Sequence, residues 1–169
     1  MITVIRQAKI DDLPCIMDIV QKTIKEMRNY NNTQWDETYP QASNFATDIE
    51  KGELFAVDRD SRLAGFICIN RVEPLEYNEL PWSQDCLALV IHRMAVNTNC
   101  RGNGVGTELL AHAECLASQA QINYLKTDTN SLNTNAQKLF ERCGYRRVGT
   151  MNFLGKEPLF YCYEKSITI

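Results

Sequence analysis

Three glycines at alternate positions form the segment of this chain whose chemistry can be stated most directly. The segment, Arg101-Gly102-Asn103-Gly104-Val105-Gly106, lies between an apolar run that ends at Val96 and a helix-like run that starts at Thr107. Glycines leave such a turn without side chains, and the first N–H groups of the following helix have no partner inside it. With the helix dipole they form a cradle for phosphate, beside which Arg101 places a positive charge. The sequence therefore predicts a phosphorylated ligand.

Three phosphate-binding patterns can be compared with this turn. A Walker A loop ends in Gly-Lys-Ser/Thr, whereas Gly106 is followed by Thr107 and a glutamate. A dinucleotide fingerprint, G-x-G-x-x-G, would have Thr107 or Leu109 in place of its third glycine. The pattern R/Q-x-x-G-x-G/A, between a strand and a helix, fits from Arg101 to Gly106 without a gap.

The elements that position the turn follow from apolar periodicity and from turn residues. Helical spacing predicts four helices, and short apolar runs predict seven strands. We expect helices over residues 11–27, 41–51, 107–121 and 133–143, and strands over residues 2–7, 53–58, 62–72, 88–96, 123–129, 145–153 and 159–165. This order predicts an α/β chain with a mixed central sheet and helices on both faces. Since no linker, repeat or low-complexity stretch divides it, we expect one domain over residues 1–169.

Composition restricts the class of protein. A 44% hydrophobic and 23% charged chain is typical of globular proteins, and a net charge of −3 argues against a nucleic-acid partner. No apolar run has membrane-spanning length, and the first residues lack the apolar core of a signal peptide, so we expect no membrane partner and a cytoplasmic location. The seven cysteines contain no C-x-x-C pair and only two histidines are present. We therefore expect no metal site, and reduced thiols that pack as small apolar side chains.

A second motif, together with the turn, identifies a family that the chain resembles. The run from Asn133 to Tyr145 fits N-x-x-A-x-x-L-Y-x-x-x-G-F, except that Phe140 stands at the tyrosine and Tyr145 at the final phenylalanine. The turn and this motif, in this order, resemble the Gcn5-related N-acetyltransferases, and the run from His92 to Val96 looks like the family's fourth strand. The order of elements matches over essentially the whole chain. The resemblance implies a mostly antiparallel sheet of about seven strands, with a V-shaped splay between the fourth and fifth.

The resemblance also implies which residues hold acetyl-CoA, the co-substrate of the family. Backbone groups of Met94, Ala95 and Val96 would face the pantetheine arm and the acetyl carbonyl. Asn133 would hydrogen-bond the pantetheine, and Phe140 would lie against the thioester. The pyrophosphate would be bound by the turn, that is by Arg101, Gly102, Asn103, Gly104, Val105, Gly106 and Thr107.

In this family an amine attacks the thioester directly, with both substrates bound, so an acid and a base are needed. We expect His92 to be the base, because it shares a strand face with Met94 and Val96 and because histidine titrates near neutral pH. A packed histidine bonded to the backbone is the alternative. Many members protonate the leaving thiolate with a tyrosine where Phe140 stands, and Phe140 cannot donate a proton. We expect Tyr161, or its neighbour Tyr163, to protonate the thiolate instead. The alternatives are that water protonates the thiolate, that the thiolate leaves unprotonated, and that these two rings only pack the sheet.

The resemblance places the acceptor amine near the loop that follows the first helix. This loop carries Trp35, Glu37 and Tyr39, and aromatic rings with a carboxylate can bind a cationic amine. A surface loop with aromatic anchors is the alternative. A second acidic stretch, described more simply as a solvated loop, contains Glu73, Glu76, Glu79 and Asp85.

These features together predict an acetyl-CoA-dependent N-acetyltransferase that acts on a primary amine of a small molecule or peptide. The competing class is a non-catalytic protein of the same fold that binds acyl-CoA as a sensor or regulator. The missing tyrosine at Phe140 keeps that class open, and His92 argues against it. The final strands offer an edge through which two copies could form a homodimer.

Overall fold

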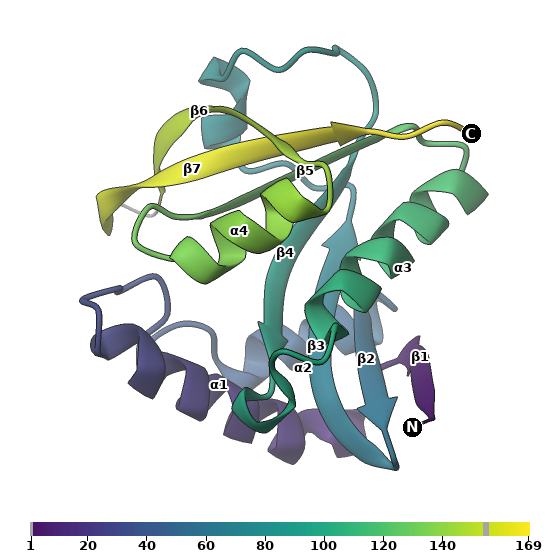
Figure 1. Ribbon diagram of the computed structural model, residues 1–169, viewed down its shortest axis with the longest axis vertical. Helices are drawn as coiled ribbons and strands as arrows, with labels where there is room; N and C mark the ends of the chain where they lie inside the picture. The colour runs from purple at the N-terminus through teal and green to yellow at the C-terminus, as the bar shows by residue number, and fades with distance from the viewer. Residues whose placement is uncertain (1, 154–155) are drawn as a thin grey trace. The chain divides into compact units, whose positions relative to one another are not determined.

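A computed structural model describes residues 2–153 and 156–169 (Figure 1). It confirms the seven predicted strands and four predicted helices. The strands are β1 (Thr3–Gln7), β2 (Leu54–Arg59), β3 (Arg62–Asn70), β4 (Leu89–Val96), β5 (Tyr124–Asn130), β6 (Arg146–Phe153) and β7 (Lys156–Ser166). The helices are α1 (Leu13–Arg28), α2 (Ala42–Glu50), α3 (Val105–Gln119) and α4 (Thr134–Arg142), with short 3-10 helices η1 (Ile10–Asp12), η2 (Leu75–Glu79) and η3 (Thr98–Cys100). Helix α3 begins two residues before the predicted start, so Gly106 and Thr107 belong to its first turn.

The strands form a mixed, mostly antiparallel sheet in the order β1-β2-β3-β4-β5-β7-β6. Strands β4 and β5 are a parallel pair whose register comprises only Leu89↔Leu125 and Val90↔Lys126, although both strands continue. Just beyond the last pair, the Thr127 hydroxyl donates to the Ile91 carbonyl at 3.1 Å, a side-chain bond where the ladder has ended. The parallel ladder therefore ends after two pairs, at the strands between which the resemblance implies a splay.

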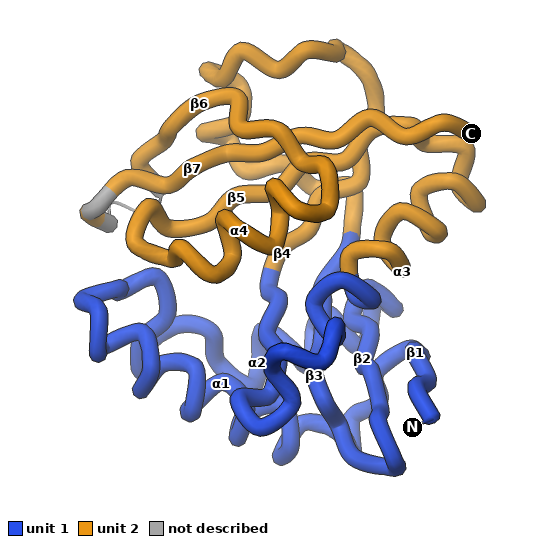
Figure 2. Tube along the Cα trace, in the orientation of Figure 1, with its two compact units in different colours: residues 1–69, 93–109 blue, residues 70–92, 110–169 orange. Residues whose placement is uncertain are grey.

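The chain forms two compact units, which Figure 2 shows in blue and orange. Unit 1 comprises residues 1–69 and 93–109, and unit 2 comprises residues 70–92 and 110–169. Strand β4 and helix α3 each contribute to both units, so the glycine turn belongs to unit 1 and His92 belongs to unit 2.

Unit 1 positions the glycine turn by packing β3 closely against its neighbours. The apolar stripe of α1 and Phe45 of α2 pack against one face of β2 and β3, around the buried Phe66. On the opposite face, a Cβ built on Gly65 would lie 2.8 Å from the Ala95 carbonyl oxygen and 3.3 Å from Val105 Cγ1. Only glycine allows this approach, so the first turn of α3 lies directly on β3 and β4.

Unit 2 has a separate core beneath the segment that joins β3 to β4. Tyr77 of η2 is fully buried and packs with Val90, Phe160 and Cys162. Helix α4 covers the opposite face, where the Phe140 and Tyr163 rings lie 5.4 Å apart between centroids. The joining segment therefore forms a cover over the face of β5 that carries alternate polar side chains.

Two other expectations concern membranes and thiols. No helix within residues 2–153 and 156–169 combines the length and hydropathy that a bilayer-spanning helix requires.

The seven cysteines are free, but the expectation that they all pack as small apolar side chains is wrong. Cys68 and Cys162 are buried, whereas Cys15, Cys86 and Cys115 are exposed, because the last three fall on the solvent side of a helix or in a loop.

Candidate active site

The glycine turn has the open geometry that a bound phosphate requires. Gly102 and Gly104 have φ of +77° and +81°, in the left-handed region that favours glycine. A Cβ on Gly102 would have no neighbour within 4 Å, and one on Gly104 would meet only Arg59 Nη2, at 4.0 Å. The Gly104 carbonyl accepts the first helical hydrogen bond of α3, from the Glu108 N–H at 3.0 Å. The N–H groups of Val105, Gly106 and Thr107 therefore have no partner inside the helix.

Two arginines lie near this turn, and each already has a carboxylate partner. Arg101, the predicted positive charge, forms an ion pair with Glu26 of α1. Arg59, at the end of β2, is 9% exposed and donates from Nη2 to Glu108 at 2.8 Å. The Nε and Nη1 atoms of Arg59 are buried without a hydrogen-bond partner among the described residues. Arg59 is therefore a second cation at the turn, with donor capacity that its single carboxylate does not use.

Helix α4 and its N-cap position the two residues of the second motif that are expected at acetyl-CoA, Asn133 and Phe140. Asn133 is the N-cap of α4, and its Oδ1 accepts from the Ala136 N–H at 3.1 Å. The Asn133 amide Nδ2 is the donor that this cap leaves for a ligand. Phe140 is buried against Tyr145 and Tyr163, at 5.9 and 5.4 Å between ring centroids.

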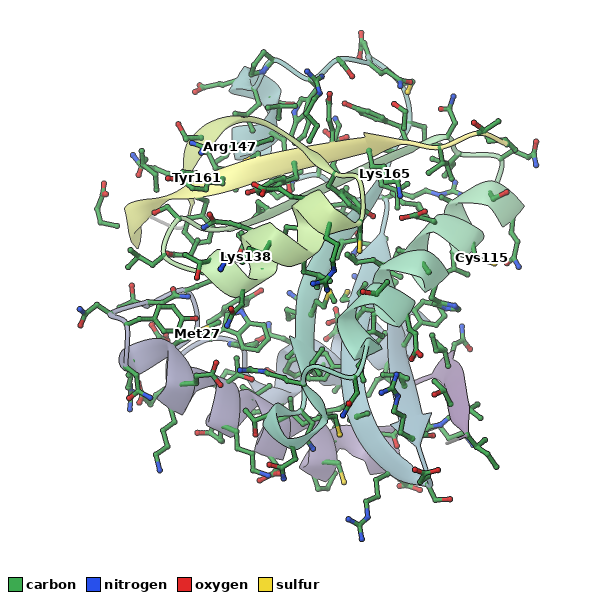
Figure 3. All side chains as sticks on the ribbon, viewed as in Figure 1. Met27, Cys115, Lys138, Arg147, Tyr161 and Lys165 are labelled. Atoms are coloured by element: carbon green, nitrogen blue, oxygen red, sulfur yellow. The ribbon has the colours of Figure 1, made fainter. Side chains whose placement is uncertain are left out.

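The two tyrosines considered as acids on β7 have different surroundings. The ring of Tyr161 is covered by the Arg147 guanidinium, whose Cζ lies 3.4 Å from the ring centroid (Figure 3). Tyr163 is the one that contacts Phe140, and its hydroxyl is buried without a hydrogen-bond partner among the described residues. Burial raises the pKa of Tyr163 above the usual value. An acid role for Tyr161 stays a prediction, and Tyr163 is the tyrosine next to the family position.

His92 lies on β4 just beyond the last pair of the β4/β5 ladder. Its Nε2 is 2.6 Å from Asn70 Oδ1, at the end of β3. Asn70 Oδ1 also accepts from the Val72 N–H at 2.9 Å, so it is an acceptor and His92 Nε2 is the donor. In a neutral His92 the other nitrogen, Nδ1, then carries the lone pair.

The half-buried carboxylate of Asp128, on β5, was not identified from the sequence. Asp128 Oδ2 accepts from the Tyr77 hydroxyl at 2.6 Å. Burial, together with the charge of Glu76, raises the pKa of Asp128 to about 6, although the Tyr77 hydrogen bond lowers it. The protonated form of Asp128 is therefore populated closer to neutral pH than that of an ordinary surface aspartate.

The predicted acceptor loop in unit 1 carries less exposed aromatic surface than expected. Trp35 is 5% exposed and stacks on Phe66 in the core, which leaves its ring little surface for a ligand. Tyr39 is half-buried, and its hydroxyl accepts from Arg93 Nη1 at 2.8 Å. Glu37 is exposed and paired with Arg28. Acceptor binding by these residues stays a prediction.

A cluster of Asp48, Glu53 and Cys68 has the spacing of metal ligands. Arg93 donates to both carboxylate oxygens of Asp48, at 2.8 and 2.6 Å, so the charge of Asp48 is already neutralised. Burial raises the pKa of the Cys68 thiol to about 12, which disfavours the thiolate that binds metals. The cluster is therefore better described as a buried ion pair beside a thiol.

The sequence and the fold are similar to those of known proteins. Residues 24–145 match the acetyltransferase (GNAT) family. The chain belongs to this family. YesJ of Bacillus subtilis, described as an uncharacterized N-acetyltransferase, is 24% identical over 163 residues, which cover 94% of this chain and 87% of YesJ.

Solved structures of GNAT proteins have the same fold. A GNAT-family acetyltransferase of Streptococcus agalactiae superimposes with a TM-score of 0.88 at 23% identity, covering 99% of this chain and 96% of that one. YncA of Salmonella typhimurium, solved with its cofactor acetyl-CoA, has a TM-score of 0.72 at 13% identity, covering 98% and 94%. At these identities the structures show the shared fold, and the expected resemblance to the GNAT family is confirmed.

The sequence of this GNAT protein pointed to the turn and to His92 but not to Arg59, Tyr77 or Asp128. These three residues are brought to their partners across 49 to 51 positions of the chain, and no local motif marks them. The acidic stretch around Glu76 was the one available signal for Asp128, and it was interpreted as a solvated loop.

Proposed function

We propose that the chain is an acetyl-CoA-dependent N-acetyltransferase that transfers an acetyl group to a primary amine. Family membership supports acetyl transfer in general, and the glycine turn is the observation that carries the choice of acetyl-CoA. Open space over Gly102 and Gly104, three helix N–H groups and a nearby arginine suit a pyrophosphate. The acetyl-CoA held in YncA is consistent with this choice.

Each unit contributes residues with a distinct task. In unit 1, the turn and Arg59 would bind the phosphates, and backbone groups of Met94 to Val96 would orient the acetyl group. In unit 2, Asn133 would hold the pantetheine through its amide Nδ2, and His92 would take a proton from the amine as the C–N bond forms. Acetyl-CoA supplies the activated acetyl group, whose thioester carbon the amine nitrogen attacks in a ternary complex.

A thiol-release assay tests this function with purified protein, acetyl-CoA and a panel of alkylamines, polyamines, amino acids and peptides. We expect thiol release with one amine class and none without an amine. Binding of acetyl-CoA without release on any amine would instead support the acyl-CoA sensor. That alternative is supported by one observation, the absence of a hydroxyl at Phe140.

We also propose that the protein works as one domain over residues 1–169, in the cytoplasm and without a metal. Pairing of two copies through the final strands stays a prediction. Size-exclusion chromatography with light scattering would show a dimer mass if the prediction is correct.

A further inference from the structure

Two side chains that can accept and donate protons lie on one face of unit 2, just beyond the last pair of the β4/β5 ladder. Val90 and Lys126 are the last pair of the parallel ladder, and paired residues point to the same face of a sheet. Side chains two residues further along each strand return to that face. His92 and Asp128 therefore lie on the same face, each one step past the last pair.

The segment that joins β3 to β4 holds both side chains in place. Asn70, at its start, is 2.6 Å from His92, and Tyr77 donates to Asp128 at 2.6 Å. Tyr77 is fully buried, and its backbone oxygen accepts from Trp82 Nε1 at 2.7 Å. Tyr77 is therefore held at its backbone by Trp82 and at its hydroxyl by Asp128. Asp128 itself is half-buried rather than enclosed.

The charges around Asp128 leave it without a cation. Lys126, its neighbour on the same face, is paired with Glu73 at 2.8 Å. Among the described residues, neither Asp128 nor Glu76 has an ion-pair partner. The titratable and charged groups near Asp128 from the elements packed on it are Glu73, Glu76, Tyr77, His92, Lys126 and Cys162. A positively charged ligand is what this surplus of carboxylates would attract.

We propose that Asp128 binds the ammonium group of a cationic primary amine and accepts its first proton, with Tyr77 as a positioning residue. This inference rests on the proposed N-acetyltransferase function and narrows its acceptor to amines that are charged at neutral pH. An ammonium must lose two protons to become an amide, and this inference assigns each of the two protons to a different side chain.

The proton balance assigns one proton to each side chain. Asp128 accepts one proton from R–NH3⁺ and releases it to solvent, which leaves the lone pair of R–NH2 free. The nitrogen attacks the thioester carbonyl carbon, the C–N bond forms, and the C–S bond breaks with its electron pair on sulfur. His92 accepts the second nitrogen proton and returns it through solvent to the thiolate, which gives the free thiol and a neutral His92. A carboxyl group whose pKa burial has raised to about 6 is a stronger base for the first step than an ordinary aspartate.

The test is the pH dependence of kcat/KM for the amine with the fastest thiol release. In the wild-type protein we expect kcat/KM to fall as pH is lowered through about 6, the range given by the pKa of Asp128. Asp128→Asn should lower kcat/KM at pH 7 by about 100-fold, the lower end for loss of an acid–base group, with acetyl-CoA affinity unchanged. Asp85→Asn, which removes the same charge from an exposed position of the joining segment, should match the wild type.

Tyr77→Phe supplies a second, independent readout that also serves if Asp128→Asn does not fold. Since the Tyr77 hydrogen bond lowers the pKa of Asp128, its loss should move the acid limb of the profile to higher pH. Histidines also titrate in this range, so the limb should persist, at a lower rate, in His92→Ala.

The results separate this inference from the function on which it depends. Wild-type protein that releases thiol, with an unchanged rate and profile in Asp128→Asn and an unmoved limb in Tyr77→Phe, would overturn the role of Asp128 and leave the transferase intact. Fastest release with a peptide whose amine is uncharged at the assay pH would also overturn it. Wild-type protein that binds no acetyl-CoA and releases no thiol would overturn both proposals.

Discussion

Replacing Gly104 by alanine separates the backbone cost of the glycine turn from its role in binding. At φ of +81° an alanine is in the left-handed region, at a cost of about 1–2 kcal/mol. The added Cβ would meet nothing closer than Arg59 Nη2 at 4.0 Å, so no packing penalty is added. We therefore expect urea denaturation to show about 1–2 kcal/mol less stability in Gly104→Ala.

Gly102→Ala is the matched control for the same backbone cost. Its φ of +77° is equivalent, and its Cβ would have no neighbour within 4 Å. Both variants should lose the same stability, but only at Gly104 does the Cβ stand beside the first free N–H groups of α3. By calorimetry we expect Gly104→Ala to bind acetyl-CoA at least about tenfold more weakly, or about 1.4 kcal/mol, and Gly102→Ala to lose clearly less.

Gly106→Ala completes the series, because Gly106 lies inside the first turn of α3. Alanine in a helix is more favourable than glycine by about 1 kcal/mol, so this variant should be more stable and should bind as the wild type does. Equal acetyl-CoA affinity in wild-type, Gly104→Ala and Gly102→Ala protein would refute the assignment of the turn to pyrophosphate.

Three further substitutions test how the fold supports this account. Gly65→Ala places a Cβ 2.8 Å from the Ala95 carbonyl oxygen, so we expect the free energy of unfolding in urea to fall by about 1–3 kcal/mol and acetyl-CoA binding to weaken. Wild-type stability and wild-type affinity in this variant would contradict the close packing at Gly65. Arg93→Met leaves the buried Asp48 carboxylate unpaired and should lower the free energy of unfolding by about 3–5 kcal/mol. The double variant Arg93→Met with Asp48→Asn should recover part of this stability, and no recovery would argue against the ion pair. Burial opposes ionisation of Glu164, but its hydrogen bonds outweigh burial and lower its pKa to about 2, so stability present above about pH 4.5 should be lost as pH falls toward 2. We expect this loss to be about 1–2 kcal/mol after allowing for solvent screening, and Glu164→Gln should reduce it. An unchanged dependence of stability on acid pH in Glu164→Gln would refute this role of Glu164.

Local patterns predicted the parts of the fold and site that depend on neighbouring residues. Helical spacing defined α1 and α4, and the glycine turn was recognised because a phosphate cradle is built from consecutive residues. The predicted start of α3 is two residues late, because glycine has a poor helix propensity and because the packing of Val105 against Gly65 joins distant positions of the chain.

Contacts between distant positions decided what the sequence could not show. Trp35 is expected at the acceptor, and this role stays a prediction. The sequence could not show that Trp35 stacks on Phe66 in the core, because an aromatic in a polar loop gives no sign of its packing. Asp128 was invisible as an acid–base group because its environment comes from Tyr77, 51 positions away, and from the cover formed by the joining segment. Arg59 meets Glu108 across 49 positions for the same reason.

Calorimetric titration of the purified protein with acetyl-CoA tests directly whether the glycine turn binds the coenzyme. We expect one binding site per chain, with affinity that falls in Gly104→Ala and persists in Asp128→Asn. Absence of binding heat, with the protein folded by circular dichroism, would contradict the phosphate site from which the proposed function is built.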